Sequence, residues 1–395
     1  MERWTRMEIA LRYGCNPHQT PARLLTAGDA APLSILNGRP GYINMLDALG
    51  AWQLVHELRR ATGLPSAASF KHTSPAGAAV ARPLTDTFRQ AYLLPDMVFS
   101  PVATAYARAR AGDRVSSYGD AVAVSDRVDV SLAQLLQREV SDLIIAPDYD
   151  PDALALLKTK KNGSYLILQI DPTYAPPVME SREIFGLTLQ QQRNSAVITT
   201  ETFGNVVTAE QQVPDQVLET LLVATIALKY TQSNSVCVAY DGQVIGMGAG
   251  QQSRIHCTRL ACDKADKWFL QQHPRVLGAK FQRGVKRVDR FNLIDQYLMW
   301  EQLSKTEEIA MLAGFTTPLE PLAHQERAAW IEQYHGICLS SDAFIPFRDN
   351  IDRASRSHVQ YIAQTGGGLR DDDVIAAAEQ YGITMMLTGL RLFLH

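Results

Sequence analysis

The sequence has little net charge, few cysteines and no long apolar segment, and each shortage excludes a class of protein. The formal net charge is −3 at pH 7, whereas a general nucleic-acid binder needs a broad basic face. The five cysteines are scattered, which favours reduced thiols over a disulfide framework. No stretch approaches the roughly 20 apolar residues of a membrane helix, and the N-terminus lacks the apolar core of a signal peptide. We therefore expect a cytoplasmic protein that binds neither nucleic acid nor membranes.

Metal-ligand spacing is also missing from the sequence. No C-x-x-C pair occurs, and the H-x-E and P-C-x-x-C motifs of zinc deaminases are absent. We interpret Cys257 and Cys262 as core residues, which is the usual place of a free cysteine. The sequence therefore predicts no catalytic transition metal.

The length of 395 residues suits two packed units or one large composite domain. Strands alternate with helices, which favours an α/β fold. Residues 241–242 (Asp-Gly) form a hairpin signal, and 164–213 is interpreted as a crossover between two halves. Hydrophobic patterning predicts strands over 67–70, 143–146, 165–170, 235–240, 243–246 and 383–386, and helices over 214–230 and 374–380.

The sharpest local signal is the pair Lys71-His72, directly after the predicted strand 67–70. Ser74 suits a helix N-cap and Pro75 a first helical position, which predicts a helix after the pair. The pair would then lie at the carboxyl end of a strand, where ligands of open α/β sheets bind. It can supply a general base and a cationic stabiliser, or it can be an exposed lysine beside a structural histidine. The residue types alone leave both interpretations open.

Two further clusters also have two interpretations each. Gly246, Gly248 and Gly250 do not follow the G-x-G-x-x-G spacing of dinucleotide loops. They serve either a tight turn or a close approach to a planar ligand, with Arg254 at the start of the next helix. Phe344 and Phe347 are most simply core residues, although their polar flanks also suit an apolar slot for a flat ring.

Five segments together resemble one family. They are 11–19 (LRYGCNPHQ), 69–78 (SFKHTSPAGA), 230–235 (YTQSNS), 248–257 (GAGQQSRIHC) and 341–350 (SDAFIPFRDN). The family is the transformylase part of the bifunctional purine synthesis proteins, which make inosine monophosphate (IMP) from AICAR, an aminoimidazole carboxamide ribonucleotide. The resemblance extends from Leu11 to Phe393.

The resemblance implies an α/β fold of two cytidine-deaminase-like α/β/α subdomains that form one composite transformylase domain. We place the first subdomain with its crossover at 1–195 and the second at 196–395. The resemblance also implies a homodimer whose active sites lie at the subunit interface. The expected ligands are AICAR and the co-substrate 10-formyltetrahydrofolate, with a structural potassium ion.

The resemblance also assigns roles to individual residues. His72 would take the amine proton, Lys71 would stabilise the formyl oxygen or protonate the leaving folate nitrogen, and Asn234 would hold the carboxamide. The nucleotide site would contain Arg12, Tyr13, Gly119, Asp142, Lys161 and Arg391. The folate site would contain Arg254, Ile255, Asn292, Phe344, Phe347 and Asp349.

The chain departs from the family pattern ahead of the first matching segment. The usual bifunctional protein carries roughly 200 further residues there, about one more domain, which close the ring. Here some ten residues precede the match, so we expect the formylated product FAICAR without ring closure to IMP. Cys15, Tyr118 and Leu394 are smaller departures.

Three other functions are weighed against this expectation. The donor could be another one-carbon folate, or the chain could be a non-catalytic nucleotide- or folate-binding homologue. The presence of Lys71, His72 and Asn234 speaks against the non-catalytic homologue. A deaminase is disfavoured because the zinc ligands are missing.

Overall fold

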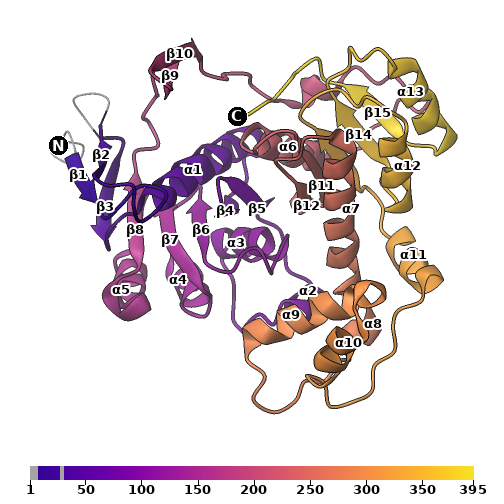
Figure 1. Cartoon of the computed structure of the whole chain (residues 1–395), viewed down its shortest axis with the longest axis horizontal. Coiled ribbons are helices and arrows are strands. Elements are labelled where there is room, and N and C mark those ends of the chain that lie inside the picture. Colours follow the sequence, from indigo (N-terminus) through magenta and orange to yellow (C-terminus); the bar gives the residue numbers. More distant parts are fainter. Residues whose placement is uncertain (1–7, 27–30) are drawn as a thin grey trace.

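The computed structural model describes residues 8–26 and 31–395 (Figure 1). Two short hairpins pair β1 (Glu8–Leu11) with β2 (Ala22–Leu25) and β9 (Met179–Ile184) with β10 (Leu187–Gln192). The remaining described strands are β3 (Leu33–Asn37), β4 (Ser66–Lys71), β5 (Ser74–Val80), β6 (Asp120–Val124), β7 (Ser141–Ala146), β8 (Leu166–Ile170), β11 (Val236–Tyr240), β12 (Gln243–Gly248), β13 (Cys338–Ser341), β14 (Tyr361–Gln364) and β15 (Thr384–Leu387). They form one sheet in the order β15-β14-β13-β11-β12-β5-β4-β6-β7-β8-β3.

Helices cover both faces of this sheet. One core cluster contains buried residues of α1 and α6, and the clusters on the other face contain residues of α3, α4 and α5 or of α7, α12 and α13. The sheet therefore lies between two helical layers, which confirms the predicted α/β class. The described helices are α1 (Tyr42–Thr62), α2 (Asp86–Ala91), α3 (Pro101–Ala111), α4 (Val130–Gln137), α5 (Pro151–Thr159), α6 (Asp215–Lys229), α7 (Arg254–Leu270), α8 (Pro274–Leu277), α9 (Arg287–Leu298), α10 (Lys305–Leu312), α11 (His324–Glu332), α12 (Asp349–Arg356) and α13 (Asp371–Gln380).

The sheet consists of two similar halves. In the order β5-β4-β6-β7-β8, the first two strand pairs are antiparallel and the last two are parallel. The order β12-β11-β13-β14-β15 repeats this pattern. The halves meet where β12 pairs with β5 in antiparallel orientation. This repeat within one sheet agrees with a composite domain of two like subdomains. The boundary at 195/196 falls in the connection between β8 and α6, and it stays a prediction.

The predicted strands and helices are confirmed except at the start of β5. Residues 74 and 75 do not begin a helix, because 74–80 form a strand between β4 and β12. Pro75 fits near the start of this strand because the β4–β5 register shifts between Ser69 and Phe70, the residue opposite Pro75. Pairing with two distant strands therefore overrides the local helix signal.

The glycines of β12 have a role that neither interpretation of the sequence anticipated. A Cβ atom at Gly246 would overlap the carbonyl oxygen of Ala261 in α7, and one at Gly248 would overlap that of Cys257. Gly77 of β5 has the same relation to Ala109 of α3. These glycines therefore let one helix in each half pack closely against the central strands. Of the cluster Gly246, Gly248 and Gly250, only Gly250 has a left-handed conformation, with φ 67°.

We expect Gly246→Ala to lower the free energy of unfolding by about 1–3 kcal/mol, because the added methyl group forces α7 away from β12. Urea denaturation monitored by circular dichroism measures the change. Gly278→Ala is the control, since its Cβ would meet the Pro274 oxygen at 3.2 Å, a tight contact, whereas a Cβ at Gly246 would overlap the Ala261 oxygen at 2.0 Å. Equal stabilities of the two variants would contradict the role given to Gly246.

Candidate active site

Lys71 and His72 lie at the turn of the β4–β5 hairpin. Lys71 ends β4, and His72 and Thr73 form the two-residue turn with φ values of 52° and 62°. Such left-handed values are typical of the type I′ turns that join short hairpins. His72 is exposed, and its imidazole makes no hydrogen bond within residues 8–26 and 31–395. This favours a histidine that is available to a ligand over a structural one.

A buried carboxylate of α1 anchors this turn. Asp47 is 6% exposed, and its Oδ1 accepts a hydrogen bond of 2.6 Å from the Thr73 N–H. Burial raises the pKa of Asp47, although this hydrogen bond and the nearby charges of His72 and Lys71 act in the opposite direction. The sequence did not point to Asp47. The available signal was an acidic residue between Met45 and Ala48, which α1 buries against the sheet.

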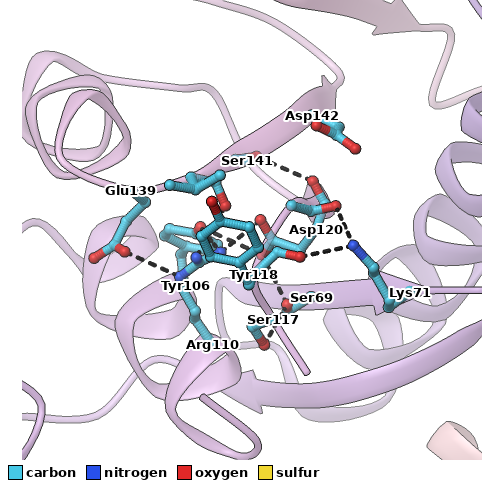
Figure 2. Close-up of polar contacts among 12 residues, drawn as sticks. Ser69, Lys71, Tyr106, Arg110, Ser117, Tyr118, Asp120, Glu139, Ser141 and Asp142 are labelled. Atoms are coloured by element: carbon cyan, nitrogen blue, oxygen red, sulfur yellow. Dashed lines mark hydrogen bonds and ion pairs between the residues drawn. The ribbon is translucent and has the colours of Figure 1, made fainter. Parts of the chain in front are cut away.

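The Lys71 ammonium contacts the segment that leads into β6. Its Nζ donates to the carbonyl oxygens of Tyr118 (2.7 Å) and Gly119 (3.2 Å), as Figure 2 shows beside the neighbouring Asp120 and Asp142. An ammonium group has three N–H donors, so these two bonds leave one for a ligand. Gly119 has φ 74°, a left-handed conformation that favours glycine, and a Cβ there would also lie close to Nζ, at 3.1 Å.

Two more of the expected nucleotide-site residues lie beside Gly119. Asp142 follows the first residue of β7, and its Oδ1 pairs with the Nζ of Lys161 at 2.6 Å. Both side chains are partly exposed. The structure thus brings together Lys71, Gly119, Asp142 and Lys161. Because β4 is antiparallel to β6, the carboxyl end of β4 meets the amino ends of β6 and β7, so the cluster does not lie at a carboxyl edge of the parallel strands.

The Asn234 loop lies against the same hairpin. The Gln232 N–H donates to the Ser74 Oγ at 3.3 Å, directly after the turn. Asn234 Nδ2 donates to the carbonyl oxygens of Gln251 (3.0 Å) and Gln252 (3.2 Å), and its Oδ1 accepts from Arg254 (3.0 Å). Three hydrogen bonds therefore fix the orientation of the third expected catalytic residue, in a loop that bonds to the hairpin of Lys71 and His72.

Arg254 is buried at 6% exposure and ties several segments together. Its Nη1 pairs with Asp342 and donates to the Ser235 carbonyl oxygen at 2.9 Å. Asp342 also accepts hydrogen bonds from Ser233 Oγ (2.6 Å) and from the Ser235 N–H (2.9 Å). The geometry shows Arg254 positioning Asn234, and a direct contact of Arg254 with folate stays a prediction.

Most of the expected folate residues gather around the first turns of α7 and α12. Arg254 and Ile255 open α7, whose Thr258 Oγ1 donates to Asn350 of α12 at 2.7 Å. Phe344 and Phe347 are 43% and 53% exposed, so their interpretation as core residues is wrong. The alternative interpretation, an apolar surface that a flat ring could contact, stays open. Asp349, the first residue of α12, is exposed as well.

The remaining predicted residues belong to other segments of the chain. Arg12 and Tyr13 follow β1, where the guanidinium lies 5.7 Å from the tyrosine ring centre. Arg391 belongs to the C-terminal segment, which bonds to the Asn234 loop through Leu394 and Ser233 at 3.1 Å. Asn292 is on α9, at a cavity that it shares with Tyr118. The predicted nucleotide and folate residues therefore come from segments that are far apart in the sequence.

The second half contains the structural counterpart of the Lys71 cluster. Through the strand register, Lys71, Gly119 and Asp142 correspond to Tyr240, Gly336 and Gln360. These three residues line a cavity of about 470 Å³ that has no lysine or arginine in its lining. The described residues therefore carry the lysine–histidine pair in the first half, and the equivalent place in the second half lacks it.

The cysteines behave as the sequence predicted. Cys257 and Cys262 are buried, and burial raises the pKa of their thiols to about 11 and about 12. Within residues 8–26 and 31–395 no group of three or more His, Cys, Asp or Glu side chains could hold a metal ion. In the same ranges no helix has the length and apolar content needed to cross a membrane.

The fold and the site define an α/β protein of two like halves in one sheet, with a lysine–histidine turn in the first half. Residues 2–264 match the model of a family described as "AICARFT/IMPCHase bienzyme", which covers more than half of the chain. The chain therefore belongs to this family.

The chain is also similar in sequence to bifunctional purine biosynthesis proteins. The chain is 31% identical over 392 residues to the bifunctional purine biosynthesis protein PurH of Xylella fastidiosa, covering 98% of this chain and 58% of that relative. It is 30% identical over 393 residues to the protein of that name from Magnetococcus marinus, covering 98% of this chain and 59% of the relative. The chain thus spans less than two thirds of the length of these relatives.

Proposed function

We propose that the chain is a formyltransferase of purine biosynthesis. It would move the formyl group of 10-formyltetrahydrofolate to the 5-amino group of AICAR, giving FAICAR and tetrahydrofolate. One observation carries the proposal: a free imidazole and an ammonium with one spare donor lie on one turn, against the Asn234 loop, in a chain of the AICARFT/IMPCHase family.

The reaction needs what these groups can supply. The acceptor amine is a weak nucleophile because the imidazole ring withdraws its electrons, and the donor formamide is a modest electrophile. His72 removes a proton as the nitrogen–carbon bond forms, and the third N–H of Lys71 stabilises the developing oxyanion. The bond from the formyl carbon to the folate nitrogen then breaks, and that nitrogen takes a proton from the Lys71 ammonium, which is restored by the proton that His72 removed.

Asn234 suits an orienting role for the acceptor. Its two N–H donors are already used on Gln251 and Gln252, and Arg254 uses one acceptor position of Oδ1. The second lone pair of this oxygen is left to accept a hydrogen bond from the carboxamide or the amine. Three fixed hydrogen bonds hold the side chain in one orientation, so little entropy is lost on binding.

The 5′-phosphate is best matched by Lys161, Arg12 and Arg391, because cationic donors bind phosphate strongly. Lys161 pairs with Asp142 beside the Lys71 cluster, whereas Arg12 follows β1 and Arg391 belongs to the segment that bonds to the Asn234 loop. We propose a homodimer with active sites at the interface, in which a second copy supplies further cations. Sedimentation velocity with and without AICAR tests this arrangement, and a monomer at turnover concentrations would contradict it.

A single assay tests the proposed function. The purified chain is incubated with AICAR and 10-formyltetrahydrofolate, and FAICAR and IMP are measured separately by chromatography, so that transfer is distinguished from ring closure. We expect stoichiometric formation of FAICAR plus tetrahydrofolate. Binding of both substrates without transfer would refute the proposal in favour of a non-catalytic homologue, and competition between folate donors decides the donor.

We expect Asp47→Ala to lower kcat about tenfold, because the turn that carries His72 loses its anchor to α1 and positioned acid–base groups supply about 10²–10⁴-fold. Asp47→Asn keeps a carbonyl oxygen for the Thr73 N–H and should restore most of kcat. KM for AICAR should change less than about twofold in both variants. Equal losses of kcat in the two variants would show that Asp47 does not act through this hydrogen bond.

A further inference from the structure

The cavity of about 470 Å³ in the second half lies at the strand ends opposite to those that carry the proposed reaction centre. Tyr240, the last residue of β11, lines this cavity, whereas Lys71 is the last residue of β4. The strand pairs β11–β12, β12–β5 and β5–β4 are all antiparallel, so β11 and β4 run in opposite directions. A ligand in this cavity would therefore be separate from the lysine–histidine turn.

The cavity repeats the architecture of the first-half site with different side chains. Residues 241–242 form the turn of the β11–β12 hairpin, in the place that 72–73 have in the first half. The N–H of the second turn residue donates to Thr220 Oγ1 of α6 at 3.0 Å, just as the equivalent N–H of the first half donates to Asp47 of α1. The second half therefore keeps the turn and its anchor, and the chemistry of the lining is what differs.

The charges of the lining disfavour an anionic ligand. The lining contains no lysine or arginine, and its carboxylates are Glu210 and Asp241. Asp241 belongs to a balanced group outside the cavity, in which two carboxylates, its own and that of Glu219, pair with Arg82 and Arg108. Glu210 is exposed to solvent and has no ion-pair partner in the described part of the chain. One solvated charge does not compensate the burial of a strongly charged ligand, so the lining favours an uncharged one.

Two hydroxyl groups of the lining are available to such a ligand. Thr384 is 3% exposed, and its Oγ1 has no hydrogen-bond partner among the described residues. The Tyr361 hydroxyl has no partner among them either. Burial raises the pKa of Tyr361, and the nearby Cys338 and Glu210 add to this, so its hydroxyl stays a donor at neutral pH. The two residues are register partners in β14 and β15, so their side chains share the sheet face that α6 covers.

The rest of the lining suits a ring compound. Apolar surface comes from Pro214, Val217 and the side chains of Tyr240 and Tyr361. The Gln216 amide lies at the same cavity, and its Nε2 donates to Asp241 at 2.9 Å, which fixes its orientation. Apolar walls with a few placed polar groups are typical of small-molecule sites, whose volumes are about 300–1,000 Å³.

We propose that this cavity binds an uncharged flat heterocycle with an exocyclic amine, which is a nucleobase or its nucleoside. The ring packs against the apolar surface, the amine donates to the Glu210 carboxylate, and ring nitrogens accept hydrogen bonds from Thr384 and Tyr361. The lining lacks the cations that a nucleotide phosphate needs, so the site distinguishes a nucleoside from its phosphate ester. An organic cation is the other ligand that a carboxylate beside aromatic rings binds, and the experiment separates the two.

Equilibrium dialysis of the full chain with adenosine and with cytidine tests the proposal. Excess AICAR is present throughout, so that the proposed nucleotide site is occupied. We expect saturable binding of one nucleoside per chain. AMP should bind at least about tenfold more weakly than adenosine, because its phosphate meets no cation in this cavity. Choline, a cation without a ring, should not displace adenosine.

Two variants locate the binding in this cavity. Thr384→Val removes a hydroxyl at nearly constant volume and should weaken adenosine binding about 2–10-fold, as the loss of one hydrogen bond predicts. Gln216→Trp brings an indole to the cavity from an exposed position of α6 and should abolish saturable binding. Gln53→Trp, at an exposed position of α1, is the matched control and should bind adenosine like the wild type. Circular dichroism checks that each variant is folded.

Three results would overturn the proposal. Absence of saturable binding of both nucleosides would show that the cavity does not take this class of ligand. Displacement of adenosine by choline would assign the cavity to an organic cation. Unchanged adenosine binding by both Thr384→Val and Gln216→Trp would place the nucleoside elsewhere on the chain. None of these measurements uses formyl transfer, so failure of the proposed function and failure of this proposal are distinguishable.

Discussion

Replacing His72 with glutamine lowers kcat for formyl transfer by about 10²–10⁴-fold, the range that a positioned general base supplies. The imidazole makes no hydrogen bond within residues 8–26 and 31–395, so the fold should survive its loss. Stopped-flow or chromatographic assays at saturating substrates measure kcat, and dialysis measures AICAR binding. We expect the affinity for AICAR to stay within about threefold, because the lost interaction belongs to the transition state.

Lys71→Met tests the cationic half of the pair and should cause a loss of kcat of similar size, since removal of one oxyanion donor costs about 10²–10³-fold. Its ammonium also bonds to two carbonyl oxygens, so the thermal midpoint must be measured beside the rate. His324→Gln on α11 and Lys158→Met on α5 are matched exposed controls and should retain full activity. Either active-site variant with more than about a tenth of the wild-type rate would take its residue out of the chemical step.

The largest effect on stability is expected for Glu139→Gln. Glu139 is almost fully buried and forms ion pairs with three arginines, one of which, Arg287, belongs to α9 of the second half. Removal of one partner from a buried ion pair costs about 3–5 kcal/mol, because the opposite charges stay behind without compensation. Urea denaturation at pH 7 measures this loss, and Glu308→Gln at an exposed pair is the control, with an expected change below about 1 kcal/mol.

The same carboxylate predicts a pH dependence of stability. Burial alone would raise the pKa of Glu139, but the charges of Arg114, Arg110 and Arg287 outweigh burial and lower it from 4.5 to about 2. A depressed pKa means that the stabilisation is complete above about pH 4.5 and is lost as the pH falls towards 2. The wild type should therefore lose more stability than Glu139→Gln between pH 5 and pH 2.5. Parallel pH profiles of the two proteins would contradict this role.

Local sequence signals predicted several elements correctly. Helix α6 was visible because its apolar residues recur with helical spacing, and Pro214 marks its start. The β11–β12 hairpin was visible because Asp241-Gly242 is the residue pair that a type I′ turn favours. The β4–β5 hairpin was missed because His72 and Thr73 occupy the same kind of turn without a glycine, beside Ser74-Pro75, which imitates a helix start.

The candidate site was only partly accessible from the sequence. The motifs named Lys71, His72 and Asn234, and the structure places their backbone segments in contact. Asp47 stayed hidden because it bonds to a residue 26 positions away. The arginine cluster around Glu139 stayed hidden as well, because Arg110 belongs to α3, Arg114 follows it and Arg287 opens α9, and only the fold brings these segments together.

The sequence by itself determined the α/β class, several of the strands and helices, and the residue types of the candidate site, because these depend on local periodicity, turn chemistry and short motifs. The tertiary structure alone decided that β5 is a central strand, that Asp47 anchors the His72 turn and that three arginines pair with the buried Glu139. The structure also identified the cavity lined by Tyr240, Gly336 and Gln360 as the counterpart of the Lys71 cluster, and the lining of this cavity has no lysine–histidine pair. Each of these facts depends on contacts between residues far apart in the chain, whose energies no short stretch of sequence contains.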